Sequence, residues 1–307
     1  MPLVTSKEML LHALENRYAV GAFNANNMEQ IQAIAEAAEE ERAPVIFQVS
    51  QGAIRYCGLA LAAGMVKSIA KLATVPVVLH LDHGTDYLQN IRCFRVGFTS
   101  LMYDGSKKSY EENVATTRRV CELAHTVGIP VEAELGCVLQ SKDNVTPEEV
   151  KAAMTDPDQA AEFIHLTGAD SLAAAVGSIH GMKSCEARLD IDRVEAVRKA
   201  AGVPLVLHGA SGVGHDDVVE AIQHGICKVN VATYLNQAFV RGMRQAMEDM
   251  PDNIDPRKFL AVGRDEMKEA IREKIRLFGS AGVVSASGGT VSKPRQFRSA
   301  ELGGTEA

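Results

Sequence analysis

Eight short segments rich in aliphatic and β-branched residues recur along the first 233 residues of the chain, and segments with the composition of amphipathic helices separate them. Several of the eight are continuously apolar, as in residues 75–79 (VPVVL), which is typical of strands in a parallel sheet covered by helices on both faces. The helical pattern is clearest at 28–41, where apolar residues recur at Ile31, Ile34 and Ala35. We expect strands at residues 18–24, 44–50, 75–82, 100–104, 130–135, 171–177, 204–208 and 228–231.

This alternation predicts an α/β fold, a TIM (β/α)8 barrel with an extra C-terminal helix. A doubly wound open sheet is the alternative, because local patterns do not show whether the sheet closes. No linker divides the chain, so residues 1–280 are expected to form a single barrel domain, with helices at 236–248 and 264–277 after the last strand. Residues 281–307, rich in Gly and Ser, are expected to be a flexible tail. The polar stretch 136–155 after the fifth strand is long enough to form a lid.

The balance of charges argues against a nucleic-acid partner. Asp and Glu number 39 against 32 Lys and Arg, the formal net charge is −7, and no basic tract is present. The longest apolar runs have the length of strands, so no membrane association is expected. The N-terminus lacks a signal-peptide pattern and the six cysteines form no CxxC motif, which together predict a cytoplasmic protein with reduced thiols.

Three histidines mark the predicted carboxyl ends of strands three, six and seven. His83, His180 and His208 would therefore share the face of a barrel that carries active sites. A single histidine could be structural, but three neutral imidazoles with a fourth position open are typical of a catalytic zinc site. His80, inside strand three, is expected in the core or next to a ligand. The other five, in helical stretches, are expected at the surface or at helix ends: His12, His125, His165, His215 and His224.

Acidic residues lie at the same predicted strand ends. Asp82 immediately precedes His83, so it is a candidate general acid/base, or alternatively a carboxylate that orients a histidine. Asp104 ends strand four and Glu134 ends strand five, and either could be a further metal ligand or a hydrogen-bonding support.

A phosphate site is predicted after strands seven and eight, where TIM barrels often bind phosphate. In residues 208–214 (HGASGVG), Gly209 and Gly212 permit close approach of the backbone, while Ser211 and Thr233 offer hydroxyl groups. Metal, phosphate and acid/base together indicate a metal-assisted reaction on a phosphorylated sugar. A Schiff-base aldolase would need a lysine near a carboxyl end, whereas Lys228 is expected at the start of strand eight.

Six motifs follow one another along the chain: AVGAFN at 19–24, HLDH at 80–83, VEAELG at 131–136, GSIHG at 177–181, LHGASG at 207–212 and KVNVAT at 228–233. With these motifs the chain resembles the class II, metal-dependent ketose-bisphosphate aldolases over residues 1–280. The resemblance implies zinc on His83, His180 and His208, with Asp104 and Glu134 at alternative metal positions, and Asp82 as the acid/base at the C4 hydroxyl. It also implies a monovalent cation (Na⁺ or K⁺), a homodimer or homotetramer, and a sugar phosphate as the small-molecule partner. The residues implied for dihydroxyacetone phosphate are Asn24, Ser50, Gly181, Gly209, Ala210, Ser211, Asn230, Val231, Ala232 and Thr233.

Two positions depart from that family's pattern. Lys142 stands where the mobile loop usually has the Glu that exchanges the C3 proton, and Lys183 stands where Tyr is usual. Either Lys142 lies on the surface and Asp143 or Glu148 supplies the carboxylate, or Lys142 and Lys183 pair with an anionic group of the aldehyde. Ala232, where fructose-type enzymes commonly have Asp, favours the tagatose-type branch.

The sequence therefore predicts a lyase, a zinc-dependent aldolase that reversibly cleaves a fructose- or tagatose-type ketose 1,6-bisphosphate to dihydroxyacetone phosphate and an aldehyde. The alternatives are a dihydroxyacetone-phosphate aldolase that uses a different, acidic aldehyde, or a catalytically impaired homologue that binds sugar phosphates.

Overall fold

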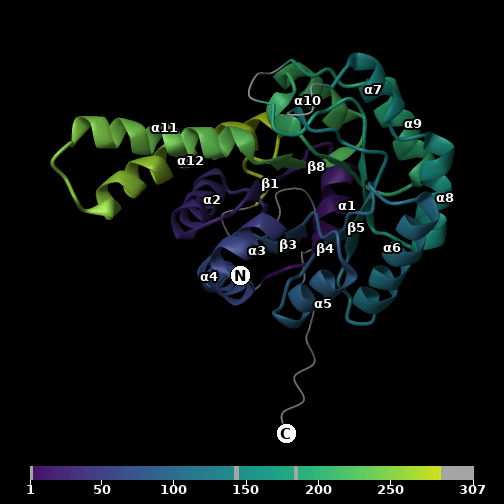
Figure 1. The fold of residues 1–307 in the computed structure, drawn as a ribbon, viewed down its shortest axis with the longest axis horizontal. Helices are drawn as coiled ribbons and strands as arrows, with labels where there is room; N and C mark the ends of the chain where they lie inside the picture. Colours follow the sequence, from purple (N-terminus) through teal and green to yellow (C-terminus); the bar gives the residue numbers. More distant parts are fainter. Residues whose placement is uncertain (1–2, 142–144, 183–185, 285–307) are drawn as a thin grey trace, which may run out of the picture.

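Eight parallel strands form the centre of the molecule in the computed structural model of the chain, which describes residues 3–141, 145–182 and 186–284 (Figure 1). The strands run in the order β3-β2-β1-β8-β7-β6-β5-β4, so sequence neighbours are also neighbours in the sheet. Their bounds are β1 Val20–Asn24, β2 Val45–Ser50, β3 Val77–Asp82, β4 Leu101–Tyr103, β5 Val131–Leu135, β6 Ser171–Ala174, β7 Leu205–Leu207 and β8 Ile226–Val231.

Contacts between the two end strands close the sheet into a barrel. His80 of β3 forms a parallel bridge with Ser100, just before β4, and the backbone N–H of Leu81 donates to the carbonyl oxygen of Ser100 (3.1 Å). The predicted TIM barrel is thus confirmed, and the open sheet is not what forms. Closure matters for function because it brings all eight carboxyl ends to one mouth.

The helices surround this barrel. Helix α2 begins where Asn27 accepts a hydrogen bond from the N–H of Gln30, and α8 and α9 end at glycines with positive φ, Gly168 and Gly202. The helices are α1 Ser6–Asn16, α2 Met28–Glu41, α3 Gln51–Cys57, α4 Leu59–Ala70, α5 Tyr87–Arg95, α6 Tyr110–His125, α7 Pro147–Ala152, α8 Pro157–Thr167, α9 Ile191–Ala201, α10 His215–Gln223, α11 Thr233–Asp249 and α12 Pro256–Leu277, with a 3₁₀ turn η2 at Ala210–Gly212.

Helix α1 packs against the amino ends of the strands. Its buried Met9 and Leu10 belong to one apolar cluster with Val20, Ile46 and Val78, one residue each from β1, β2 and β3. That end of the barrel is therefore filled, which leaves the carboxyl ends as the open face.

His12 also lies on this buried side of α1, with 6% of its surface exposed, and its Nδ1 is 2.9 Å from the hydroxyl oxygen of Tyr18. The expectation of a surface or helix-end position was wrong for this histidine, because the helix turns that face toward the barrel.

Strand β8 begins two residues earlier than expected, at Ile226, which changes the position of Lys228. This lysine is the third residue of the strand and is 1% exposed inside the barrel, rather than at the entrance of the strand. Ile226 already pairs with Leu205 of β7, and the buried Cys227 lies at a register shift between this pair and the pair formed by Lys228 and Val206, so the strand begins before Lys228.

The last two helices form a hairpin that projects from the barrel (Figure 1). They pack closely against each other at two glycines. A Cβ at Gly242 of α11 would lie 2.8 Å from the carbonyl oxygen of Val262, and one at Gly263 of α12 would lie 2.8 Å from that of Phe239. Helix α12 begins at Pro256, eight residues before the expected start, because Asp255 accepts from the N–H of Arg257 and caps it.

The end of α12 is anchored to α2. Arg272 and Arg276 both bond the carboxylate of Glu41, at 2.8 and 2.6 Å. The chain then stays packed, since Val284 is buried and its N–H donates to the carbonyl oxygen of Arg42 (3.0 Å). Residues 281–284 of the predicted tail are therefore part of the packed structure, and the remainder of that tail lies outside the described residues.

The insertion after β5 contains a short helix, α7, with a capping box between Thr146 and Glu149. No single helix in the described ranges is long and apolar enough to cross a membrane, although α3 and α4, bent by 100° at their junction, pass the same test of length and composition as a pair.

The close approach of α11 and α12 predicts opposite effects for two helical glycines. Gly64→Ala in α4 should raise the free energy of unfolding by about 0.5–1 kcal/mol, because open space surrounds that position and Ala favours helix. Gly242→Ala should lower it by about 1–3 kcal/mol, because the new methyl group meets the α12 backbone. Urea denaturation measures both, and equal shifts in the two variants would contradict the packing described.

Candidate active site

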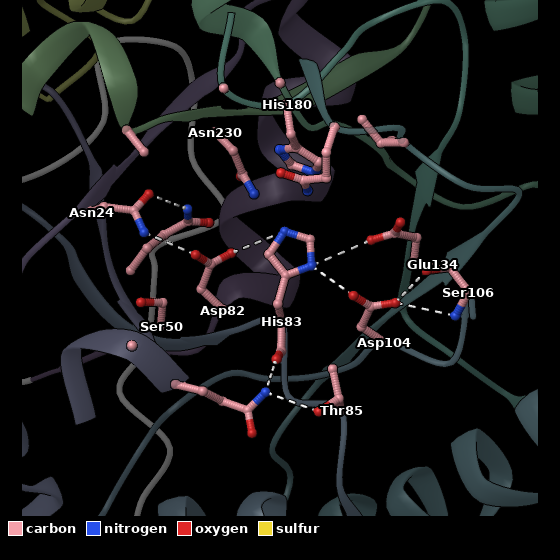
Figure 2. Close-up of a pocket in the computed structure, with 18 of the residues that line it drawn as sticks. Asn24, Ser50, Asp82, His83, Thr85, Asp104, Ser106, Glu134, His180 and Asn230 are labelled. Carbon is pink, nitrogen blue, oxygen red and sulfur yellow. Dashed lines mark hydrogen bonds and ion pairs between the residues drawn. The ribbon is translucent and has the colours of Figure 1, made fainter. Parts of the chain in front are cut away.

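A cavity of about 470 Å³ opens at the carboxyl ends of the strands (Figure 2). It receives side chains from β1, β2, β3, β5 and β8 and from the loops that follow β3, β4, β6 and β7. Its lining contains most of the residues predicted for the site: Asn24, Ser50, Asp82, His83, Asp104, Glu134, His180, Gly181, Gly209, Ser211, Asn230, Ala232 and Thr233.

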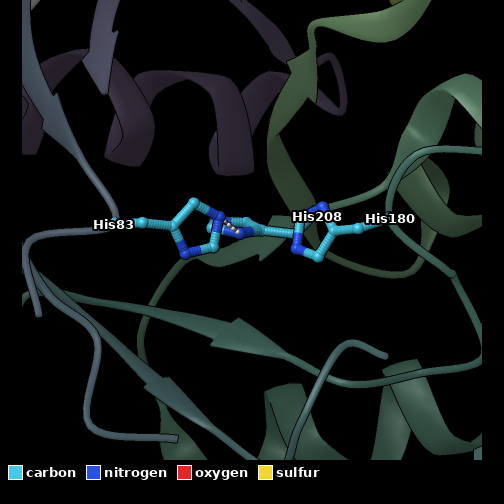
Figure 3. A group of neighbouring side chains, drawn as sticks. All are labelled: His83, His180 and His208. Atoms are coloured by element: carbon cyan, nitrogen blue, oxygen red, sulfur yellow. Dashed lines mark hydrogen bonds between the residues drawn. The ribbon is translucent and has the colours of Figure 1, made fainter. Parts of the chain in front are cut away.

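The three predicted histidines converge in this part of the barrel (Figure 3). The ring centroid of His83 lies 5.1 Å from that of His180 and 4.6 Å from that of His208. One nitrogen of each ring lies within 4.8 Å of one nitrogen of each of the other two rings. His208 is fully buried, whereas the other two are partly accessible from the cavity. A group of this kind could hold a metal ion.

The backbone of His83 has a conformation that side chains rarely adopt, with φ of 48°. Gln51 donates from Nε2 to the carbonyl oxygen of His83 (2.6 Å) and to Thr85 Oγ1 (3.0 Å), while the N–H of His83 points to Met102 Sδ (3.3 Å). These contacts hold a strained turn directly after β3, which is a common property of functional residues.

Hydrogen bonds fix the protons on two of the rings. His208 Nε2 lies 3.0 Å from Glu132 Oε1, and a carboxylate can only accept, so this nitrogen carries the proton and Nδ1 keeps its lone pair. His83 donates from Nε2 to His208 Nδ1 (3.1 Å) and from Nδ1 to Asp104 Oδ2 (2.8 Å). His208 thus presents a neutral nitrogen toward the other two rings.

The pKa values follow the same arrangement. Burial lowers the pKa of His83, but the carboxylates of Asp82, Asp104 and Glu134 outweigh it and raise the value to about 10. Burial, followed by the charge of His83, lowers the pKa of His180 to about 4 and that of His208 well below its ordinary value. Two of the three rings are therefore neutral at pH 7, as metal ligands must be, whereas His83 would have to release its Nε2 proton to bind a cation.

Asp82 lies beside the triad on the side of β1 and β2 (Figure 2). Asn24 donates from Nδ2 to its Oδ2 (2.9 Å), and Gln48 in turn donates to Asn24 Oδ1 (3.1 Å). The other oxygen, Oδ1, is buried without a hydrogen-bond partner and lies 3.9 Å from His83 Nε2. This geometry leaves one oriented acceptor directed at the centre of the site.

Asp104 and Glu134 lie on the opposite side of His83. Asp104 is engaged by His83 Nδ1 and by the hydroxyl of Ser106 (2.7 Å). Glu134 Oε2 is 3.6 Å from His83 Nδ1 and has no hydrogen-bond partner, and burial together with Asp104 raises its pKa to about 8. The three side chains form a second group that could hold a cation, while Asp104 as placed orients the histidine.

A buried ion pair lies directly below the triad. Glu132 of β5 accepts from His208 at Oε1 and from Lys228 Nζ at Oε2 (2.6 Å), and both members of the pair are at most 2% exposed. Lys228 Nζ also lies 3.1 Å from His80 Nε2, whose Nδ1 contacts Ser100 Oγ (2.8 Å). The core position expected for His80 is what the structure shows, and Lys228 is committed to this network rather than exposed in the cavity.

The predicted phosphate loops form one wall of the cavity. Gly209 has φ of 69°, and a Cβ there would come within 2.9 Å of the backbone of Ile179, so the loop after β7 packs closely against the loop after β6. Ser211 Oγ accepts from the N–H of Tyr234, at the start of α11 (3.3 Å). We use the name phosphate cup for the residues Gly181, Gly209, Ser211, Ala232 and Thr233.

Not every predicted substrate residue faces the cavity. The side chains of Ala210 and Val231 are buried in the apolar core, so only their backbone atoms are available to a ligand. Lys142, Asp143 and Lys183 lie outside the described residues, while Glu148 is on α7 and does not line the cavity.

Several lining residues were missed from the sequence. Gln48 could have been found, because it is a polar residue within a strand that is otherwise largely apolar. So could Glu132, which lies below the triad outside the lining and is one of two Glu residues in β5. The other lining residues, at the start of α3 and in the loops, carry no such signal, and they become visible only when these segments meet: Gln51, Gly52, Thr85, Ser106, Lys107, Cys137, Val138 and Gln140.

Comparison with known proteins is consistent with this geometry. A family model described as "Fructose-bisphosphate aldolase class-II" matches residues 4–283. The chain belongs to the class-II fructose-bisphosphate aldolase family. It is 45% identical over 284 residues to a probable fructose-bisphosphate aldolase of Bacillus subtilis (strain 168), covering 92% of this chain and 99% of that one. It is also 45% identical over 285 residues to the fructose-bisphosphate aldolase of Geobacillus stearothermophilus, with the same shares covered.

Solved structures of aldolases share the fold. The crystal structure of the YdjI aldolase from Escherichia coli K12 superposes with a TM-score of 0.80 at 38% identity, covering 91% of this chain and 98% of that chain. A putative fructose-1,6-bisphosphate aldolase from Coccidioides immitis also superposes with a TM-score of 0.80, at 32% identity, covering 90% of this chain and 98% of that one.

The buried pair below the triad predicts a specific stability pattern. Lys228→Met should lower the free energy of unfolding by about 3–5 kcal/mol, because Glu132 would be left as an uncompensated buried charge. The double variant Lys228→Met/Glu132→Gln should lose less of its free energy of unfolding than the single variant, since neither charge remains. Urea denaturation of the metal-free protein measures this.

A matched control is Lys199→Met, which breaks a surface pair with Glu195 and should leave stability nearly unchanged. If Lys228→Met were as stable as that control, the network would not be a structural element of the barrel.

Proposed function

We propose that this chain catalyses the reversible cleavage of a ketose 1,6-bisphosphate to dihydroxyacetone phosphate and a phosphorylated aldehyde. One observation carries the proposal: a histidine triad, an unpartnered carboxylate oxygen and a loop wall suited to phosphate share a single cavity. The names of the relatives support the same reaction.

The residues present fit a divalent cation. His180 Nε2, Asp82 Oδ1 and Glu134 Oε2 are buried polar atoms without a hydrogen-bond partner, and they cluster around His83. Three imidazoles are typical ligands of catalytic zinc, so we assign zinc to His83, His180 and His208. When bound there, the ion supplies Lewis-acid polarisation of a carbonyl group and stabilises the enediolate charge.

Asp82 is the acid/base of the proposed reaction. Asn24 occupies its Oδ2, which leaves Oδ1 to accept the proton of the C4 hydroxyl group. As that O–H bond breaks, C4 becomes the aldehyde carbonyl and the electrons of the C3–C4 bond pass to the enediolate of dihydroxyacetone phosphate. In the reverse direction the same carboxyl group returns the proton.

The phosphate cup would hold the C1 phosphate. Ser211 and Thr233 offer hydroxyl groups and Gly209 brings its backbone close, next to the N-terminus of α11, whose peptide dipoles favour an anion. This places the phosphate end beside β7 and β8, with the reacting carbons between the triad and Asp82.

The two alternatives expected from the sequence, an acidic aldehyde partner and an impaired homologue, rest on Lys142 and Lys183. Both residues lie outside the described part of the chain. The arrangement of Asp82 and Asn24 favours a catalytically competent enzyme instead.

Four further properties remain predictions: a monovalent cation in the site, a homodimer or homotetramer, a cytoplasmic location and the tagatose-type preference suggested by Ala232. Activity with and without Na⁺ or K⁺ tests the first, and light scattering tests the second. Cell fractionation tests the location, and parallel assays of the two C4 epimers test the substrate preference.

The purified protein should cleave a ketose 1,6-bisphosphate and hold about one divalent ion per chain. Excess chelator should abolish activity, zinc should restore it, and His208→Ala should lose the metal. A coupled assay for dihydroxyacetone phosphate and metal analysis measure these outcomes. Full activity in chelator, or covalent trapping of substrate by borohydride, would overturn the metal-dependent proposal.

Asp82→Asn should retain zinc and dihydroxyacetone phosphate binding but reduce kcat by roughly 10²–10⁴-fold, because an amide cannot accept the C4 proton. Asp86→Asn is the control, since Asp86 caps α5 outside the cavity and Asn also caps helices well. If Asp82→Asn instead loses its metal and regains turnover as zinc is added, Asp82 supports the ligands and is not the acid/base.

A further inference from the structure

A buried lysine lies behind the phosphate cup, outside the lining of the cavity. Lys274, near the end of α12, is 7% exposed. Its Nζ donates to His215 Nε2 (3.1 Å) at the start of α10 and lies 4.5 Å from the centre of the Tyr234 ring at the start of α11. One ammonium group therefore joins the ends of three helices that meet at the loops after β7 and β8.

This lysine brings positive charge into the interior. The charge of Lys274, followed by burial, lowers the pKa of His215, so that ring is neutral and accepts the hydrogen bond. The partial positive ends of α10 and α11 add to it. The carboxylates of Glu273 and Asp216 act in the opposite direction on His215, but from exposed positions, so the buried charge here is that of Lys274, and an anion nearby would complement it.

Contacts connect Lys274 to the cup itself. The Tyr234 ring receives the ammonium group, its hydroxyl donates to Glu273 (2.8 Å), and its backbone N–H donates to Ser211 Oγ (3.3 Å). Among the described residues that line the cavity, the one Lys or Arg side chain is Lys107, which follows β4, on the far side of the barrel mouth from β8. Through Tyr234, Lys274 is thus connected to the cup.

We propose that Lys274 is a positioning residue for the C1 phosphate: it fixes Tyr234 against Ser211 and supplies a positive charge behind the cup. This rests on the proposed function, because the phosphate group belongs to the ketose bisphosphate. Lys274 touches no substrate atom in this arrangement and takes no part in proton transfer.

The test is Lys274→Met, which keeps an unbranched apolar stem and removes the charge. The KM for the bisphosphate and the inhibition constant of inorganic phosphate should each rise about tenfold. This is the effect expected from losing the attraction between one partly screened charge and a phosphate group a few ångströms away. The kcat should change by less than about threefold. Lys274→Arg, which keeps the charge, should stay within about threefold of the original protein in all three quantities.

The matched control is Lys268→Met on the same helix. Lys268 pairs with Glu40 (3.0 Å) and does not line the cavity. The KM and the phosphate inhibition constant of this variant should therefore equal those of the original protein. If Lys274→Met behaves like this control, or if it lowers kcat at constant KM, the proposal is wrong.

Phosphate binding without turnover separates this proposal from the proposed function. At one and the same concentration, inorganic phosphate should raise the Tm of the original protein and of Lys268→Met more than it raises the Tm of Lys274→Met, as a tenfold weaker affinity requires. If no ketose bisphosphate is cleaved but this pattern holds, the activity proposal fails and the role of Lys274 stands. Should Lys274→Met fail to fold, His215→Leu removes the acceptor of the ammonium group and should weaken phosphate protection, and unchanged protection would refute the proposal.

Discussion

The Glu132 carboxylate joins the interior of the barrel to its active site. One oxygen binds Lys228 and the other binds His208, and all three side chains are almost completely buried. Burying this carboxylate without the ammonium group would lower the free energy of unfolding, and so would burying the ammonium group without the carboxylate. Because Glu132 can only accept, it also determines which nitrogen of His208 faces the cavity. The same pair thus contributes to stability and to the orientation of a candidate metal ligand.

The barrel and the location of its site were predictable because both depend on local patterns. Apolar strand-length runs alternating with amphipathic helices indicated eight β/α units, and in a closed parallel barrel any residue at a carboxyl end shares one mouth. The positions of His83, His180 and Asp82 follow from that rule alone. The rule needs no knowledge of how neighbouring strands are aligned.

The network below the mouth was not predictable in this way, because it depends on register. Lys228 contacts Glu132 only because β8 starts at Ile226 and the barrel closes between β3 and β4. A sequence pattern gives neither the closure nor the first residue of a strand. The buried position of His12 also depends on tertiary contacts. The early start of α12 differs, because Asp255 followed by Pro256 is a local start signal that was missed from the sequence.

Charge organises the cavity into two ends. On one side, the carboxylates Asp82, Asp104 and Glu134 surround His83, and they raise its pKa to about 10. That side attracts a cation and would repel a phosphate group. On the other, the loops after β7 and β8 lack carboxylates in the cavity lining, and Lys274 lies behind them. Under the proposed function, a ketose bisphosphate would therefore be oriented by electrostatics before any specific contact forms: its C1 phosphate would be directed to the cup, and its carbonyl and C4 hydroxyl group would be directed to the triad and Asp82.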